Sequence, residues 1–173
     1  MNSLLSRAVL ILTVLAAALP GRVAADQSNG RILSIQLPGP AEPGAAATPG
    51  PALELTLEQL RSLPVARIRT TTHWTSGLQQ FEGVHLFTLL RYLGIQSGQI
   101  ELLAINDYSV TIPVAEIMPE GALLAFLRNG EPMSPRDKGP IWVVFDYDGN
   151  AAFRTETVFS RSIWQLDRII VSR

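Results

Sequence analysis

The sequence predicts a single β-rich α+β domain of mixed short strands with two short helices. Short apolar runs separated by turn residues dominate the chain, and each has the length of a strand. Helix signals stand out in two segments, 57–63 and 84–93. The 173 residues are 47% hydrophobic and include no cysteine, so one packed core without disulfides has to stabilise the domain.

The first 25 residues have the pattern of a secretory signal peptide. Met1–Arg7 carries one positive charge, Ala8–Leu19 is apolar, and residues 23–25 are small, which predicts cleavage after Ala25. The apolar run is too short to span a bilayer comfortably, so we expect a periplasmic protein with no membrane span after cleavage. Arg7 stands alone, so the twin-arginine signal for folded export is missing.

The charge of the chain is nearly balanced. Cleavage would remove Arg7 and Arg22 from the 14 basic residues and none of the 15 acidic ones, leaving a net charge of −3. Such a balance argues against a nucleic acid or an anionic membrane as partner. Lys138 is the single lysine, and the other basic residues are arginines, which suit planar contacts with anions.

Residues 26–52 are expected to form an N-terminal strand and a connector. Arg31–Leu37 alternates in period two, which predicts a strand. Pro38–Pro51 is rich in proline, glycine and alanine, which predicts a flexible connector. The domain itself is expected to cover residues 53–173, and it begins with a short extended piece at Leu53–Leu55.

Two helices follow in the first half of the domain, one on each side of a strand at Val65–Thr72. Thr56 and Gln59 have capping-box spacing, which predicts a helix from residue 57 to 63, before Pro64. The second helix opens at Val84, and Gly94 suits a left-handed cap at its end. Four leucines are expected on its buried face: Leu86, Leu89, Leu90 and Leu93.

The second half of the domain is expected to be mainly strands. Asn106-Asp107 predicts a tight turn, and Asn129-Gly130 predicts a hairpin. Val114–Ile117 has room for one helical turn. The strands predicted around these signals are Ile100–Ile105, Tyr108–Ile112, Ala122–Leu127, Ile141–Phe145 and Trp164–Val171.

A polar and aromatic stretch closes the strand at Val65–Thr72. As a ligand pocket, Arg69 would meet an anion, His73 would exchange a proton and Trp74 would form an aromatic wall. As an edge strand, Arg69 would be solvated and Trp74 would fill the core. The two histidines, His73 and His85, have no acidic cluster beside them, so the sequence predicts no metal site and no catalytic residue.

Two later segments could border the same pocket. Tyr108 could stack on a ligand, although Asn106-Asp107-Tyr108 also fits a simple Asx-turn. Arg136 and Lys138 precede a glycine that lets the backbone approach a ligand closely. The alternative for this segment is a solvated loop with a local pair between Arg136 and Asp137.

Several short motifs occur in a fixed order between Leu53 and Val171. They are Thr-x-x-x-Trp, Phe-x-Gly-Val-x-Leu-x-x-Leu-Leu, Asn-Asp-Tyr, Asn-Gly-x-Pro-Met, Asp-Lys-Gly-Pro and Trp-Gln-Leu. In this order the chain resembles the sulfite-oxidase-type molybdopterin-binding domain. The resemblance implies that fold, with the cofactor pocket at Arg69–Trp74 and the loop before Gly139-Pro140 beside it.

The resemblance breaks at one position. The family carries Arg-Cys-x-x-x-Trp, whose cysteine thiolate binds molybdenum, whereas this chain has Arg69-Thr70-x-x-x-Trp74. A neutral hydroxyl lacks the charge and the softness of a thiolate. Family members with this cofactor are exported already folded, and a general secretory signal delivers an unfolded chain. Both features predict a relative without a cofactor.

We therefore expect a secreted, periplasmic binding or sensing module. It would recognise a small polar or anionic ligand, or an envelope protein such as a membrane-bound signalling receptor. Two alternatives stay open: a molybdopterin-dependent oxidoreductase with a non-cysteine metal site, and a structural subunit without a small-molecule site. The residues expected to bind the ligand are Arg69, Thr70, His73, Trp74, Tyr108, Arg136 and Lys138.

Overall fold

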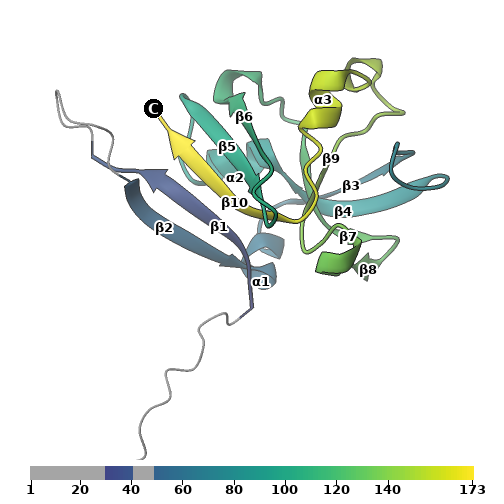
Figure 1. Ribbon diagram of the computed structural model, residues 1–173, viewed down its shortest axis with the longest axis horizontal. Helices are drawn as coiled ribbons and strands as arrows, with labels where there is room; N and C mark the ends of the chain where they lie inside the picture. The colour runs from purple at the N-terminus through teal and green to yellow at the C-terminus, as the bar shows by residue number, and fades with distance from the viewer. Residues whose placement is uncertain (1–29, 41–48) are drawn as a thin grey trace, which may run out of the picture.

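Two β-sheets carry the hydrophobic core in the computed structural model, which describes residues 30–40 and 49–173 (Figure 1). Within these residues the sheets are joined by three short α-helices and three short 3₁₀ turns. The predicted α+β class, rich in β-structure, is confirmed. The predicted signal peptide and residues 41–48 of the predicted connector lie outside the described residues.

The first sheet has the strand order β2-β1-β10-β5-β6. Strand β1 pairs antiparallel with β2 and parallel with β10, while β5 pairs antiparallel with β10 and β6. Strand β2 begins at Pro49, so the residues just before Ala52 are paired with β1 and do not belong to the connector. The bounds are β1 Arg31–Pro38, β2 Pro49–Thr56, β5 Gln99–Ala104, β6 Ser109–Pro113 and β10 Leu166–Ser172.

The second sheet has the order β3-β4-β7-β8, and β9 also pairs with β7. Strand β4 was not predicted, because its Val84 and His85 were expected to open a helix. Gly83 within it passes so close to β7 that an added Cβ would lie 2.2 Å from the carbonyl oxygen of Leu124. The bounds are β3 Val65–Thr70, β4 Gln79–His85, β7 Leu123–Arg128, β8 Glu131–Pro132 and β9 Trp142–Val144.

Helix α1 (Leu57–Arg61) confirms the predicted capping box. The Thr56 hydroxyl accepts a hydrogen bond from the N–H of Gln59, and the Gln59 side chain accepts one from the N–H of Thr56. Two reciprocal bonds of this kind satisfy main-chain donors that the first helical turn leaves free. The sequence therefore determines locally where the chain turns from β2 into helix.

Helix α2 (Leu86–Tyr92) buries three of the four predicted leucines, and Leu93 is half-buried. Gly94 adopts a φ of 73° and donates to the carbonyl of Arg91, while the N–H of Ile95 donates to the carbonyl of Leu90. This pair of bonds is a Schellman motif, which satisfies the last carbonyls of a helix. The predicted glycine cap is confirmed.

Helix α3 (Glu156–Ser160) is a third helix that the sequence reasoning did not anticipate. The Thr155 hydroxyl caps it by accepting a hydrogen bond from the N–H of Val158. The predicted hairpin at Asn129-Gly130 joins β7 to β8, with both residues at positive φ. The 3₁₀ turns are η1 Val114–Glu116, η2 Pro135–Asp137 and η3 Ala151–Phe153.

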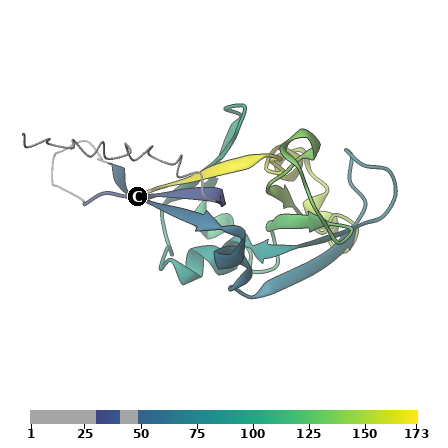
Figure 2. The same cartoon turned by 90° about the horizontal axis from the view of Figure 1, so that it is seen from below.

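The buried side chains of both sheets form one connected hydrophobic cluster. The loop between β3 and β4, residues 71–78, projects from the end of the molecule opposite the C-terminus (Figure 2). None of the helices in the described residues is long and apolar enough to cross a bilayer. The loop carries Trp74, which packs against Trp142 of β9, Phe159 of α3 and Trp164 after α3.

Candidate functional site

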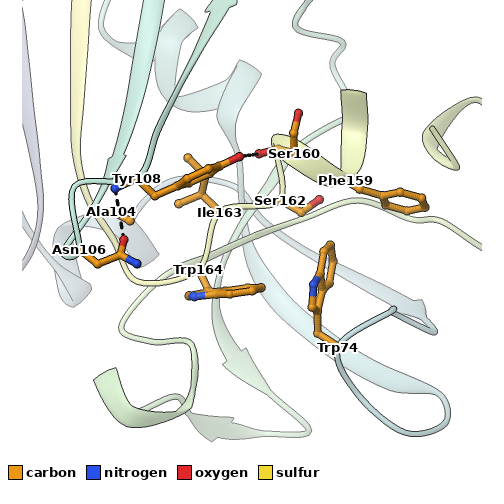
Figure 3. A pocket seen from close by; sticks show the side chains of 9 residues that line it. All are labelled: Trp74, Ala104, Asn106, Tyr108, Phe159, Ser160, Ser162, Ile163 and Trp164. Atoms are coloured by element: carbon orange, nitrogen blue, oxygen red, sulfur yellow. Dashed lines mark hydrogen bonds between the residues drawn. The ribbon is translucent and has the colours of Figure 1, made fainter. Parts of the chain in front are cut away.

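A cavity of about 210 Å³ opens between the β3–β4 loop, the β5–β6 turn and the segment that follows α3 (Figure 3). Four of its lining residues are aromatic, and those described carry no charge. We call this cavity the aromatic cleft. Its lining residues are Trp74, Ala104, Asn106, Tyr108, Phe159, Ser160, Ser162, Ile163 and Trp164.

Trp74 is the corner of the aromatic cleft. Its ring centre lies 5.8 Å from that of Trp164 and 6.2 Å from that of Phe159, with interplanar angles of 77° and 85°. Figure 3 shows Trp74 and Trp164 nearly perpendicular, which is the edge-to-face arrangement that aromatic pairs favour. Trp74 also packs at 6.0 Å against the buried Trp142, so the wall is anchored in the core.

One hydrogen bond joins the β5–β6 turn to the end of α3 across the aromatic cleft, and a second lies within the turn. The hydroxyl of Tyr108 donates to the carbonyl oxygen of Ser160 over 3.0 Å, and the Tyr108 N–H donates to the Asn106 side chain over 3.3 Å. Asp107 between them has a φ of 63°, a left-handed conformation that aspartate tolerates in tight turns. The predicted turn is confirmed, and it also holds Tyr108 at the cavity.

Ser162 has the most buried hydroxyl of the lining, and this hydroxyl already makes hydrogen bonds within the protein. It donates to the carbonyl oxygen of Val158 and shares a 2.6 Å hydrogen bond with the hydroxyl of Tyr147. Burial raises the pKa of Tyr147 to about 12, so this neighbour stays neutral and cannot take a proton near pH 7. Tyr147 therefore cannot act as the base that would make Ser162 a nucleophile.

Two basic side chains rest on the walls of the aromatic cleft without lining it. The Lys138 Nζ lies 4.1 Å from the ring centre of Trp164 and 5.3 Å from that of Trp142. The His73 ring lies 4.2 Å from the ring of Phe159. Lys138 follows η2 with a φ of 66°, so the turn itself directs this residue toward the tryptophans.

The two arginines proposed from the sequence lie apart from the cavity. Arg69 is exposed on β3, and its neighbour Thr70 points inward because side chains alternate along a strand. Arg136 is exposed in η2, where Asp137 pairs with Arg128 over 2.6 Å. The alternative of a local pair between Arg136 and Asp137 is not what the structure has, and neither Arg69 nor Arg136 lines the aromatic cleft.

Thr70 is fully buried and both of its hydrogen-bonding roles are occupied. Its hydroxyl donates to the carbonyl of Thr71 and accepts from the N–H of Asp148, each over 3.1 Å. The Asp148 carboxylate accepts from the Thr71 N–H over 2.6 Å and from the Thr71 hydroxyl over 2.9 Å. These bonds, the main-chain one first, lower the pKa of Asp148. The network fastens β3 to the turn after β9.

Of the seven residues expected at the site, Trp74 and Tyr108 line the aromatic cleft, while His73 and Lys138 touch its walls. No residue of the segment 159–164 was expected at the site. Trp164 was expected to open the final strand, but β10 begins at Leu166. Phe159 lies near the end of the five-residue helix α3, so no periodic pattern marks the segment. In the described residues there is no cluster of three His, Asp or Glu side chains able to hold a metal ion.

The chain is similar to known proteins over its middle part. The family model described as oxidoreductase molybdopterin binding domain matches residues 49–149. The chain is also 24% identical, over 99 residues, to the "Uncharacterized oxidoreductase YuiH" of Bacillus subtilis (strain 168), which covers 54% of this chain and 50% of that protein. The chain thus spans about half the length of this relative. The family match includes Trp74 and Tyr108 and ends before Phe159 and Trp164.

Proposed function

The chain belongs to the oxidoreductase molybdopterin-binding domain family, and from that premise we propose that it is an exported binding module whose small ligand occupies the aromatic cleft. The observation that carries the proposal is the cavity of about 210 Å³ between Trp74, Tyr108, Phe159 and Trp164. Concave, mostly apolar hollows with a few polar groups are the usual form of small-molecule sites.

The residues at the family's metal position do not fit molybdenum. The resemblance places the ligating cysteine at Thr70, and the sequence contains no cysteine at all. The Thr70 hydroxyl is neutral, fully buried and bonded to Asp148 and Thr71. Soft metal centres of this kind need a thiolate, so the proposal assigns no molybdenum-dependent step to this protein.

The groups around the aromatic cleft support binding more than covalent catalysis. Ser162, the buried hydroxyl of the lining, is bonded to a Tyr147 that stays neutral. Asn106 and Ser160 offer polar atoms at the rim, which can orient a ligand without reacting with it. The signal-peptide pattern of residues 1–25 supports the periplasm as the compartment in which binding takes place.

The intrinsic fluorescence of the protein offers a direct test. The chain has three tryptophans, and Trp74 contacts both Trp142 and Trp164, so tryptophan emission reports on the aromatic cleft. Protein purified from its native envelope would be analysed for molybdenum, for pterin fluorescence after oxidation and for released small molecules by mass spectrometry. The released compound would then be titrated back while the emission is followed.

We expect a small organic compound to be released and to change the emission when it is added back. Phe159→Ala should weaken that binding, whereas Tyr92→Ala, a change on the exposed face of α2, should leave it unchanged. Stoichiometric molybdenum or pterin would support the oxidoreductase alternative and overturn the proposal. Binding that survives Phe159→Ala and Trp164→Ala alike would show that the ligand occupies another place.

A further inference from the structure

We propose that the aromatic cleft selects a single planar ring with a negative charge, such as an aromatic carboxylate, and that it discriminates against cations. The inference rests on the proposed function of the cleft as a ligand site. It is carried by three properties of the cavity: its volume, the angles between its walls, and the position of Lys138 behind Trp164.

The volume suits a ligand of one ring with a short substituent. A dry cavity of roughly 150 Å³ is enough to bind benzene. Pockets for drug-sized ligands have volumes of about 300–1,000 Å³. At about 210 Å³ the aromatic cleft lies between the two, so it admits a ring and a group of a few atoms.

The walls favour a flat molecule. Trp74 stands at 77° to Trp164 and at 85° to Phe159, so the cleft offers both ring faces and ring edges. A flat ring can stack on one wall while its edge meets the face of another, which is how aromatic groups pack best. The amide nitrogen of Asn106 leaves a donor at one side for the negative substituent, whereas the Tyr108 hydroxyl already donates its proton to Ser160.

Aromatic walls alone would equally suit a quaternary ammonium ion, so the charges near the walls decide between the two classes. Lys138 already places its ammonium 4.1 Å from the ring centre of Trp164, and it does not line the cavity. A cationic ligand on that ring would be repelled by Lys138, because the ring is thin and the medium between them is poorly polarisable. A negative group in the cleft is attracted by the same charge.

The acidic groups of the neighbourhood do not reverse this preference. Those lining residues that the structure describes include no carboxylate. Glu116 is engaged with Arg161 over 2.6 Å, and Asp107 is exposed in the β5–β6 turn. The local field thus favours an anion, although the whole chain has a net charge of −1.

Three probes with one ring and different charges test the inference: benzoate, benzamide and phenyltrimethylammonium. Binding to the full-length protein would be followed by tryptophan emission and by calorimetry at low salt. We expect benzoate to bind best and the cation worst, with about a fivefold difference or more from the Lys138 charge. Lys138→Met should weaken benzoate about fivefold and leave benzamide unchanged, because it keeps the length of the side chain and removes its charge.

Two further variants serve as controls. Lys138→Arg keeps the positive charge that Lys138→Met removes, so it should keep the preference for benzoate. Arg136→Met removes a positive charge two residues away that does not line the cavity, and it should not change the order of the probes. Denaturant midpoints of all variants would establish that each is folded.

The outcomes separate this inference from the proposed function. If benzamide or the cation binds as tightly as benzoate, and Phe159→Ala abolishes that binding, the inference about charge is wrong and the cleft remains a ligand site. If Lys138→Met and Arg136→Met weaken benzoate equally, the effect is a general one of net charge and the role of Lys138 is refuted. If none of the probes binds, the ligand class is wrong, and the compound released from the native protein decides the proposed function.

Discussion

The hydroxyl of Thr70 accepts a hydrogen bond from the main-chain N–H of Asp148 over 3.1 Å. This single bond joins the last residue of β3 to the turn that follows β9. It lies where the family resemblance places a metal ligand. At this position, therefore, the side chain is buried and takes part in the internal hydrogen bonding of the protein.

Thr70→Val tests this structural role. Valine has nearly the same shape but cannot accept from the N–H of Asp148, and a hydrogen bond of this kind contributes about 0.5–1.5 kcal/mol. We expect the free energy of unfolding in urea to fall by that amount. Thr111→Val, at an exposed position of β6, is the matched control and should change it little. Equal midpoints for the two variants would contradict the role assigned to Thr70.

Asp148 should make the stability of the fold depend on acidic pH. Hydrogen bonds from the main chain and hydroxyl of Thr71 lower the pKa of its carboxyl. Because the carboxyl has a lower pKa in the folded state, it stabilises the protein at pH values above its pKa in the unfolded chain, about 3.9. That contribution disappears as the pH falls through the lower pKa of the folded state. The difference in urea midpoint between wild type and Asp148→Asn should therefore be largest at pH 5–7 and shrink below pH 4. A difference that stays constant would refute this assignment.

Tyr147 should make the stability of the fold depend on alkaline pH. Burial raises the pKa of Tyr147 to about 12, so the folded state keeps a proton that the unfolded chain loses near pH 10. The stability that this provides is present below pH 10 and is lost as the pH rises from 10 toward 12. Tyr147→Phe should flatten this loss, measured by denaturant unfolding between pH 8 and 11.5. Tyr92→Phe, with a side chain 72% exposed, should behave as wild type.

Leu90 should contribute strongly to stability because it is buried beneath α2, with 2% of its surface exposed. Leu90→Ala removes apolar contacts and leaves a cavity, which costs roughly 2–5 kcal/mol. Leu78→Ala makes the same chemical change at a position that is 51% exposed in the β3–β4 loop, and it should cost far less. Chemical denaturation of both variants checks the comparison. If both variants lost a similar free energy of unfolding, Leu90 would not belong to the hydrophobic core.

The parts of the fold that were predictable from the sequence are those determined by neighbouring residues. The capping box of Thr56 and Gln59, the glycine cap at Gly94 and the Asn129-Gly130 hairpin depend on local chemistry, and all are present. Strand β4 was not predictable in this way. Its Gly83 weakens the strand signal, and what requires glycine there is the carbonyl of Leu124 on a strand far along the chain.

The residues of the candidate site show the same difference between local signals and long-range contacts. Trp74 and Tyr108, which line the aromatic cleft, could be singled out because each follows a recognisable strand or turn. Phe159 lies within a five-residue helix and Trp164 follows it, and this helix is too short to show a period. The binding roles of Arg69 and Arg136 stay predictions. Strand alternation alone already placed Arg69 on the face opposite to Thr70, so the two could not both point into one pocket.

The parallel pairing of β1 with β10 has a consequence for how the chain can be delivered. Arg31 bonds Asp167 across 136 positions of sequence, so the first sheet cannot close until residues 166–172 are available. A chain that crosses a membrane with its N-terminal end first would hold β1 and β2 as an unsupported hairpin throughout transit. Such long-range closure slows folding, and it leaves the early strands within reach of chaperones and proteases until the last strand has emerged.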